Sequence, residues 1–141
     1  MDREKLIEYM LGFMPLLHKK LFKDFHCYDY SRQQIILMRI IEKDQGKPMK
    51  YYGEKMMISK PNLTTVVNKL KEDGLIERRY SENDRRIINL FLTEKGHKLL
   101  VFHTEQIKKD MLVRLEVLND RDIKTLNENF EEMSNIFSKL V

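Results

Sequence analysis

The sequence predicts a mainly α-helical fold that carries one small β-hairpin, which places it in the α+β class. Apolar residues recur every three or four positions along most of the 141-residue chain, as they do on the buried side of a helix. Near the middle, two short runs typical of strands are separated by a polar turn, which is the pattern of a hairpin. The same central part carries an excess of Lys and Arg, which indicates a surface that attracts nucleic acid.

The positive charge is concentrated in one part of the chain. Residues 47–98 contain 12 Lys and Arg against 7 Asp and Glu, whereas the two flanking segments together contain 14 against 15. The central segment therefore holds the whole positive excess of the chain, whose formal net charge is +4. A localised basic surface of this kind is typical of nucleic-acid binding, although an ordinary solvated face can carry the same charge.

The composition is typical of a folded protein of the cytoplasm. Hydrophobic residues make up 42% of the chain and charged residues 34%, the balance of a globular protein. No apolar run approaches the roughly 18 residues that span a membrane, and the charged N-terminus lacks the apolar block of a signal peptide. The single cysteine excludes an internal disulfide framework. We therefore expect a cytoplasmic protein without membrane contact.

The first helix is predicted over residues 3–25. Its apolar residues cover more than half of its circumference, so it needs neighbours on two sides, which a small monomer rarely provides. Pro15 removes a backbone donor within this helix and is expected to bend it near Gly12; a broken first helix is the alternative.

The next two helices are predicted from the residues at their ends. Ser31 and Gln34 have the spacing of a capping box, which opens a helix that Gly46 closes and Pro48 keeps from continuing. The nearly continuous apolar residues of this second helix predict a central place in the core. A short third helix follows at about residues 52–57.

The fourth helix has an apolar side and a polar side. Ser59 is suited to cap it, Pro61 fits its first turn, and Gly74 ends it. Short polar side chains on one side allow close approach to a partner. The apolar residues of the other side follow the i, i+3, i+4, i+7 spacing of one helical stripe: Leu63, Val66, Val67 and Leu70.

A β-hairpin is predicted directly after this helix. Its two strands cover residues 76–80 and 87–92. The polar turn between them, residues 82–86, contains two arginines and would stand out from the lobe as a charged finger.

Two long helices complete the chain. Thr93 caps the first of them, at about residues 94–117, and Asn119 with Asp122 caps the second, at about residues 120–140. The last helix has the heptad spacing of helices that pack along a seam. The two helices could pack on each other within one subunit, but because the first helix also needs cover, an intertwined helical dimer is favoured. The expected dimer interface comprises Leu6, Met10, Phe13, Ile123, Leu126, Phe130, Met133 and Phe137.

Three short helices followed by a two-stranded hairpin form a winged helix-turn-helix. The predicted organisation is a dimerisation helix at residues 1–28, a winged lobe at residues 29–97 and dimerisation helices at residues 98–141. The fourth helix suits the major groove, where each base pair shows a distinct pattern of donors and acceptors. Its candidate DNA-binding residues are Ser59, Lys60, Pro61, Asn62, Thr64, Thr65, Asn68 and Lys69.

The residue types on this helix predict particular contacts. Asn62 and Asn68 can pair with adenine edges, and the lysines with the DNA backbone or guanine. Thr64 and Thr65 can contact bases or phosphates.

The hairpin would act as the wing. Arg85 and Arg86 at its tip suit a narrow minor groove, and Arg79 on its first strand is a further candidate. Asp84 is unusual there, because phosphate repels a carboxylate. We expect Asp84 to hold a neighbouring arginine or the turn backbone in place.

In this central part the chain resembles the MarR family of winged-helix transcriptional regulators. The match extends over residues 58–96 in order and spacing. The matching residues are Ile58-Ser59-Lys60-Pro61-Asn62-Leu63-Thr64, Leu70, Gly74-Leu75-Ile76, Arg78, Asp84-x-Arg86 and Leu92-Thr93-Glu94-Lys95-Gly96. The chain departs from the family at Tyr52-Gly53, where Leu-Ala is usual, and at Met57, where a turn glycine is common.

The resemblance implies a homodimer whose first, fifth and sixth helices intertwine while two winged lobes read a pseudo-palindromic operator. It also implies that Asp84 and Arg86 are the wing signature and that the fourth helix is the recognition helix. Such regulators are mostly repressors. Many release DNA when a small aromatic compound binds between the dimerisation helices and the winged lobe.

A cluster of aromatic residues could line such an effector pocket, because aromatic walls suit apolar ligands. Ordinary core packing explains the same residues and stays open as the alternative. The cluster comprises Phe25, Tyr28, Tyr30, Tyr51 and Tyr52.

Other chemistries have weaker signals. Cys27 could sense peroxide, as in one branch of this family, although that branch carries its cysteine nearer the start of the first helix; a packed, inert cysteine is the default. The histidines lack the i, i+3 or i+4 spacing of metal ligands, so we expect neither a metal nor a cofactor. No phosphate loop or nucleophile elbow is present, so we do not expect an enzyme. The four histidines are His18, His26, His97 and His103.

The sequence therefore predicts a homodimeric, sequence-specific DNA-binding regulator, a repressor released by a small effector. Its operator would be a duplex of roughly 15–20 base pairs, with half-sites about one helical turn apart. The alternative is a winged-helix module that binds protein and does not read DNA.

Overall fold

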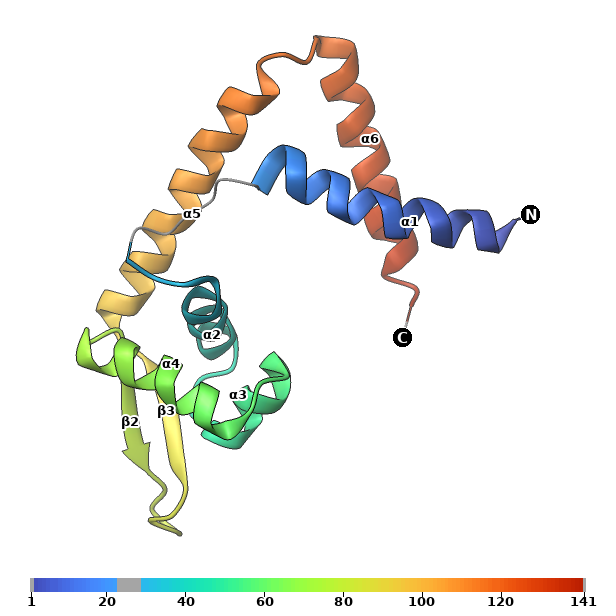
Figure 1. Cartoon of the computed structure of the whole chain (residues 1–141). Coiled ribbons are helices and arrows are strands. Elements are labelled where there is room, and N and C mark those ends of the chain that lie inside the picture. Colours follow the sequence, from blue (N-terminus) through green and yellow to red (C-terminus); the bar gives the residue numbers. More distant parts are fainter. Residues whose placement is uncertain (1, 23–28, 141) are drawn as a thin grey trace. The chain divides into compact units, whose positions relative to one another are not determined.

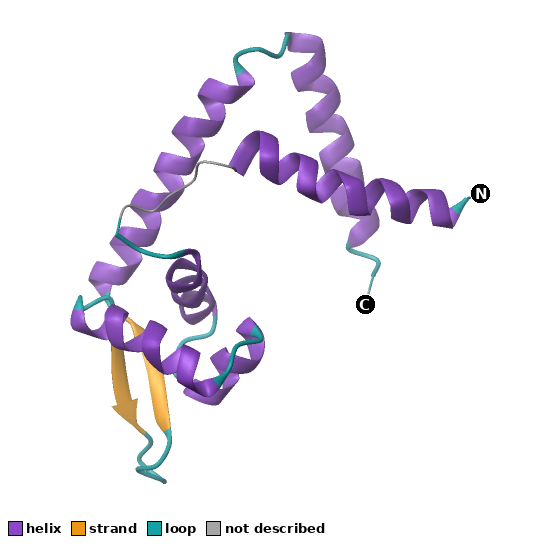
Figure 2. Cartoon of the chain, in the orientation of Figure 1, coloured by secondary structure: helices purple, strands orange, loops and turns teal. Residues whose placement is uncertain are grey.

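The computed structural model describes residues 2–22 and 29–140 (Figure 1). Within these residues the chain is mostly helical with one small antiparallel sheet, which confirms the predicted fold class (Figure 2). The chain forms two compact units, Met1–Ile107 and Lys108–Val141. The elements in chain order are α1 (Arg3–Leu17), η1 (His18–Phe22), α2 (Arg32–Lys43), β1 (Lys47–Pro48), α3 (Met49–Met56), α4 (Lys60–Glu72), β2 (Ile76–Tyr80), β3 (Ile88–Leu92), α5 (Glu94–Leu115) and α6 (Asp120–Phe137).

The core of the first unit is built around α2, as predicted. Leu37 and Met38 of this helix are fully buried, and so is Tyr52 of α3. The Tyr52 hydroxyl donates to the backbone oxygen of Asp44 at 2.5 Å and accepts the backbone N–H of Lys47 at 3.1 Å. Burial raises the pKa of Tyr52, so the hydroxyl keeps the proton that it donates. The polar tip is thus satisfied, and the ring joins α3 to the chain before β1.

The sheet has three antiparallel strands in the order β1-β3-β2. The predicted hairpin is confirmed, because Ile76 pairs with Leu92 and Tyr80 pairs with Ile88. Strand β1 is an addition to the prediction. It has two residues, Lys47–Pro48, and is too short to show the alternation by which a strand is recognised in sequence.

Two predicted helix boundaries are wrong. α2 ends at Lys43, so Gly46 does not close it. Gly46 instead has a φ of +76° and donates its N–H to Leu90 at 2.8 Å, which starts the pairing of β1 with β3. α3 begins earlier than predicted, at Met49, because Pro48 in an extended conformation serves as its N-cap.

The predicted first helix of residues 3–25 is divided in the structure. α1 continues through Pro15 and ends at Leu17, and the π-helical element η1, His18–Phe22, follows it. Residues 23–25 lie outside the described residues.

Three predicted helix starts are confirmed by their hydrogen bonds. Ser31 and Gln34 form both bonds of the capping box, at 3.3 and 2.7 Å. Asn119 and Asp122 form the same pair of bonds at 2.9 and 3.3 Å. Ser59 caps α4 through its side-chain oxygen. Each of these caps is worth about 1 kcal/mol of stability.

One junction joins the end of α4 to the base of the hairpin. Gly74 ends α4 with a φ of +70°. Its N–H donates to the backbone oxygen of Lys71 at 3.0 Å, and the N–H of Leu75 donates to that of Leu70 at 2.9 Å. These two bonds form a Schellman motif, which turns the chain directly from the helix into β2.

Thr93 and Gly96 complete this junction from the other side. Thr93 donates its backbone N–H to the oxygen of Leu75 at 3.1 Å, and its hydroxyl lies 2.7 Å from the oxygen of Gly74. The same hydroxyl oxygen accepts the N–H of Gly96 at 3.1 Å, so Thr93 caps α5 as predicted. A Cβ on Gly96 would lie 2.3 Å from the Leu75 oxygen, so this position requires glycine.

We expect Gly96→Ala to lower the free energy of unfolding by about 1–3 kcal/mol, because the added methyl group displaces the Leu75 backbone. Chemical denaturation at fixed protein concentration measures the loss. Glu94→Ala, at an exposed position of the same helix, should change stability by less than about 0.5 kcal/mol. Equal losses in the two variants would contradict the role given to this contact.

Met57 forms the turn between α3 and α4 in a left-handed conformation, with φ 56° and ψ 40°. Among the described residues it is the only non-glycine with a positive φ. Such a backbone costs a residue with a Cβ roughly 1–2 kcal/mol. The side chain is 91% exposed, so packing does not offset this cost. A glycine would adopt the same turn without this cost.

We expect Met57→Gly to stabilise the protein by roughly 0.5–1 kcal/mol, because glycine adopts this conformation without strain but loses more chain entropy on folding. Thermal unfolding followed by circular dichroism measures the shift in Tm. Gly74→Ala is the matched control: nothing lies within 4 Å of its added Cβ, so a loss of stability there comes from the positive φ alone. A lower Tm for Met57→Gly would be inconsistent with backbone strain at this turn.

Candidate nucleic-acid interface

The side of α4 that faces away from the core carries polar residues. The predicted apolar stripe, including Leu63 and Val67, is buried, so the opposite side of the helix lies in solvent. Ser59 fixes where this exposed side begins, because it caps the helix. The predicted DNA-binding residues on it are exposed or, for Thr64, partly buried: Ser59, Lys60, Pro61, Asn62, Thr64, Thr65, Asn68 and Lys69.

The threonines of α4 use their hydroxyl hydrogens inside the helix. Thr64 donates to the backbone oxygen of Lys60 at 3.0 Å, and Thr65 donates to that of Pro61 at 3.2 Å. In this arrangement they offer a methyl group and oxygen lone pairs to a partner. They therefore suit the methyl group of thymine or a base N–H better than a phosphate, which needs donors.

Lys69 is held at the end of α4 by Asp73, with 3.2 Å between the ammonium nitrogen and the carboxylate. Asp73 also accepts the hydroxyl of Tyr30 at 2.9 Å. The Tyr30 hydroxyl, and after it Lys69, hold the pKa of Asp73 below its usual value, so the carboxylate stays charged. Lys69 therefore has a partner before any DNA arrives, whereas Lys60 forms no ion pair within the described residues.

The wing tip is ordered by Asp84. Its carboxylate accepts the backbone N–H of Arg86 at 3.0 Å and the Nε of the same residue at 3.2 Å. The backbone bond, and after it the side-chain bond, lower the pKa of Asp84. A depressed carboxylate pKa means that this ordering is present above the usual Asp value and is lost only as the pH falls below it.

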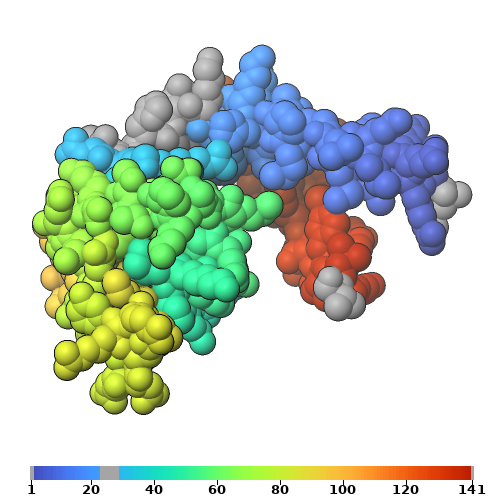
Figure 3. Space-filling model, turned by 60° about the horizontal axis from the view of Figure 1, so that its bottom comes forward, coloured from blue at the N-terminus to red at the C-terminus, as the bar shows by residue number. Residues whose placement is uncertain are grey.

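Arg86 is thus aimed by Asp84 but remains accessible. Its side chain is 91% exposed. The wing projects from the lobe in the space-filling view (Figure 3). An exposed arginine on a projecting hairpin has the shape and charge that insertion into a minor groove requires.

The two arginines of β2 have different surroundings. Arg79 lies over the ring of Phe91, 4.0 Å from the ring centre, and pairs with Glu77 at 3.0 Å. Arg78 points to the other side of the strand and donates to the side-chain oxygen of Asn68 on α4. Strand β2 and helix α4 are therefore joined by a side-chain hydrogen bond.

Arg78 is not among the predicted site residues. The signal that could have found it is strand alternation, because Ile76 is buried and every second residue of a strand faces the same side. Arg78 therefore follows Ile76 toward the helix. An arginine on the inner face of a strand is an exception to the apolar pattern and marks a specific contact.

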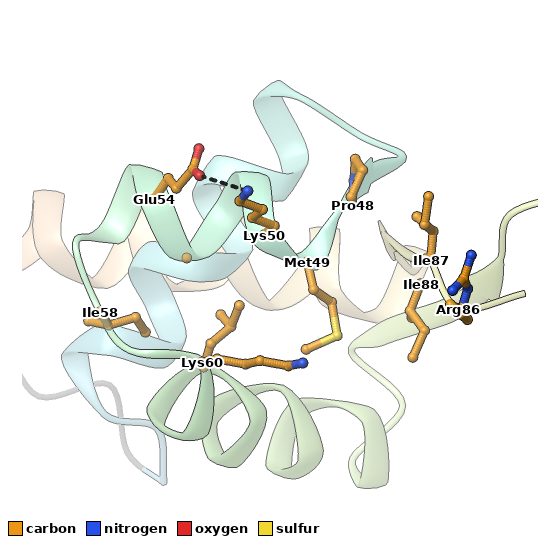
Figure 4. Close-up of a pocket in the computed structure, with 11 residues that line it drawn as sticks. Pro48, Met49, Lys50, Glu54, Ile58, Lys60, Arg86, Ile87 and Ile88 are labelled. Carbon is orange, nitrogen blue, oxygen red and sulfur yellow. Dashed lines mark ion pairs between the residues drawn. The ribbon is translucent and has the colours of Figure 1, made fainter. Parts of the chain in front are cut away.

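A hollow of about 540 Å³ lies between α3, the start of α4 and the part of the wing where its tip leads into β3 (Figure 4). Met49, Ile58 and Ile88 contribute apolar walls. Lys60 from α4 and Arg86 from the wing also line it. Two cations from the two candidate DNA-binding elements thus border one hollow, an arrangement that suits a backbone phosphate.

The residues expected for an effector pocket are only partly described. Tyr30 binds Asp73, whereas the Tyr51 hydroxyl donates to the Asp44 carboxylate at 2.7 Å, so these tyrosines have separate partners. That hydrogen bond is the main cause that raises the pKa of Tyr51. A role of these residues in effector binding stays a prediction. The further residues Phe25, His26, Cys27 and Tyr28 lie outside the described residues.

Within residues 2–22 and 29–140, no group of three His, Cys, Asp or Glu side chains is placed to hold a metal ion. None of the helices in this part of the chain combines the length and apolar content that a membrane crossing requires.

Comparison with known proteins gives one consistent result. The model of the MarR family matches residues 30–88. The HTH-type transcriptional regulator YpoP of Bacillus subtilis is 27% identical over 136 residues, which are 92% of this chain and 96% of YpoP. The transcriptional regulator Tm0710 of Thermotoga maritima superposes with a TM-score of 0.76 at 15% identity, covering 97% of this chain and 96% of its own.

A second solved structure contains DNA. Streptococcus pneumoniae FabT in complex with DNA superposes with a TM-score of 0.59 at 22% identity, covering 99% of this chain and 100% of its own. Together these likenesses show that the whole chain has the fold of winged-helix regulators.

Proposed function

Because the chain belongs to the MarR family, we propose that it is a homodimeric, sequence-specific DNA-binding regulator of transcription, a repressor released by a small effector. In this proposal α4 lies in the major groove and the wing reaches the adjacent minor groove. The presence of DNA in the FabT structure, which shares the fold, supports the proposal that the chain binds DNA. The operator is a pseudo-palindromic duplex of roughly 15–20 base pairs.

The observation that carries the proposal is the pair Asp84–Arg86 beside the exposed side of α4. A carboxylate on a surface that meets phosphate is unfavourable unless it has a partner. Both carboxylate oxygens of Asp84 accept hydrogen bonds from Arg86, so the pair presents an oriented guanidinium. A merely solvated basic hairpin would not need this acidic residue.

The dimer part of the proposal is supported by apolar residues that the single chain leaves uncovered. α1 and α6 contain no buried residue. Large apolar side chains of both helices are exposed by about 40% or more, and a helix stripe of this kind needs a covering partner. They include Leu6, Met10, Phe13, Leu126, Phe130, Met133 and Phe137.

We expect Arg86→Ala to weaken operator binding and to reduce the slope of log K against log salt concentration by about one, because one phosphate-facing or groove-facing cation is lost. Fluorescence anisotropy with a duplex selected by the wild-type protein, at several salt concentrations, measures both effects. Lys124→Ala is the control, since it removes one exposed cation from α6.

The outcomes separate the two functional hypotheses. Equal affinity and salt slope for Arg86→Ala and Lys124→Ala would remove the wing from the DNA-binding surface. If the wild-type protein selects no duplex even at low salt, the regulator is rejected in favour of a winged-helix module that binds protein.

We expect Phe130→Asp to dissociate the dimer, because a charge at the centre of an apolar seam loses its hydration on association. Sedimentation velocity at micromolar concentration should give the monomer mass and a lower affinity for the two-half-site operator. Asn135→Asp places the same charge on the opposite side of α6 and should leave the dimer intact. A Phe130→Asp protein that sediments as a dimer would exclude this seam from the interface.

A further inference from the structure

Asn68 and Arg78 form a contact that determines which hydrogen-bonding groups of the Asn68 amide are available to a base. Asn68 lies on the exposed side of α4, and Arg78 lies on β2 with its side chain directed toward that helix. The Nη2 group of Arg78 donates to the side-chain oxygen of Asn68. Both residues belong to the first compact unit, so the contact is internal to the winged lobe.

The orientation of the Asn68 amide follows from the chemistry of its partner. A guanidinium has five N–H donors and no acceptor, so the amide atom that faces it must be the oxygen. The amide NH2 group of Asn68 consequently points away from Arg78. A hydrogen bond from a charged donor is stronger than one between neutral groups, and it holds this rotamer before any partner binds.

The location of Arg78 indicates that the contact is retained for more than packing. The Nε atom of Arg78 is buried and has no hydrogen-bond partner among the described residues. Leaving a buried donor unpaired destabilises a fold, and an apolar residue would fit the inner face of a strand better. Arg78 thus carries an unpaired buried donor at a position from which it holds an amide of α4.

We propose that Arg78 is a positioning residue that makes Asn68 read guanine in the major groove; this inference rests on the DNA-binding function proposed above. An asparagine reads adenine by accepting from N6 and donating to N7 at the same time. The oxygen of Asn68 faces Arg78 and accepts from it with one of its two lone pairs, so the side chain presents its NH2 donors outward. Guanine presents two acceptors, O6 and N7, whereas adenine presents an N–H donor beside N7.

In this arrangement Asn68 reads guanine and not the adenine expected from the sequence. The arrangement also gives Arg78 a function without direct DNA contact. The positive charge behind the amide polarises the NH2 group and makes it a better donor. Specificity at one base pair would thus depend on a residue of the wing strand.

The test begins with selection of duplexes from a random library by the wild-type protein, followed by affinity measurements on the selected operator with each base pair exchanged. We expect one position in each half-site at which guanine is preferred to adenine by roughly ten-fold. Asn68→Ala should lose this preference at that position alone. Arg78→Leu frees the amide to turn, so its ratio of guanine to adenine affinity should fall to within about two-fold.

Two matched variants separate positioning from general effects. Arg78→Lys supplies another side chain that only donates, so it should keep most of the guanine preference. Arg79→Leu removes the neighbouring arginine from the other side of the strand and should weaken guanine and adenine operators by the same factor. Circular dichroism of each variant establishes whether it is folded.

The outcomes are decisive in either direction. If the wild-type protein selects an operator but Asn68→Ala keeps every base preference, the inference is overturned and the DNA-binding function stands. The same holds if a folded Arg78→Leu protein keeps the guanine preference. If Arg78→Leu does not fold, the result for the exposed Asn68→Ala change decides alone. Failure of the wild-type protein to select any duplex overturns the proposed function itself.

Discussion

The winged lobe depends on one backbone oxygen, that of Leu75. This oxygen accepts the N–H of Thr93 at 3.1 Å and lies 3.0 Å from its hydroxyl, and it leaves no room for a Cβ on Gly96. Leu75 follows the end of α4, and Thr93 lies between β3 and α5. A single buried atom therefore fixes three things at one point: the end of the candidate recognition helix, the base of the hairpin and the start of α5.

Two further contacts lie between this junction and the wing tip: Arg78 with Asn68, and Arg86 with Asp84. Exposure to solvent increases from the junction to the tip. Leu75 is 1% exposed, Arg78 is half-buried and Arg86 is open to solvent. A hydrogen bond is stronger where water is excluded. The buried junction therefore holds the hairpin in place, and the partly buried Arg78 orients the side chain of Asn68. The pair at the tip lies in water, where such pairs are worth at most about 1 kcal/mol. The Asp84–Arg86 pair can therefore rearrange to fit a DNA groove at a small cost in free energy.

Features that depend on near neighbours in the chain could be predicted from the sequence. The capping box of Ser31 and Gln34 involves residues three apart, and the α4 stripe needs only helical periodicity. Strand β1 and the end of α2 could not be predicted, because both depend on pairing with β3, which is more than 40 residues away. In the candidate site, the exposed polar face of α4 and the Asp84–Arg86 pair could also be predicted from the sequence.

Arg78 was missed for a related reason. Arg78 and Arg79 are adjacent and chemically identical, and only the direction of each side chain distinguishes them. That direction follows from the burial of Ile76, and burial is a property of the folded lobe. Charge counting treats both arginines as DNA contacts, but the structure assigns one to an asparagine of α4 and the other to Phe91 and Glu77.

The same distinction applies to the positive charge of the central segment. Much of that charge is paired in the folded chain, as in Lys69–Asp73 and Lys50–Glu54. The lysine of each pair is exposed, so a phosphate can replace the carboxylate at a cost of about 1 kcal/mol. The charge counted from the sequence therefore still estimates how strongly the lobe attracts a DNA backbone. Contacts with the backbone carry no direct information on base sequence, because every duplex presents the same phosphates. Discrimination among duplexes has to come from groups that meet the base edges. For Asn68 of α4 the orientation of such a group is set by Arg78 of the wing strand.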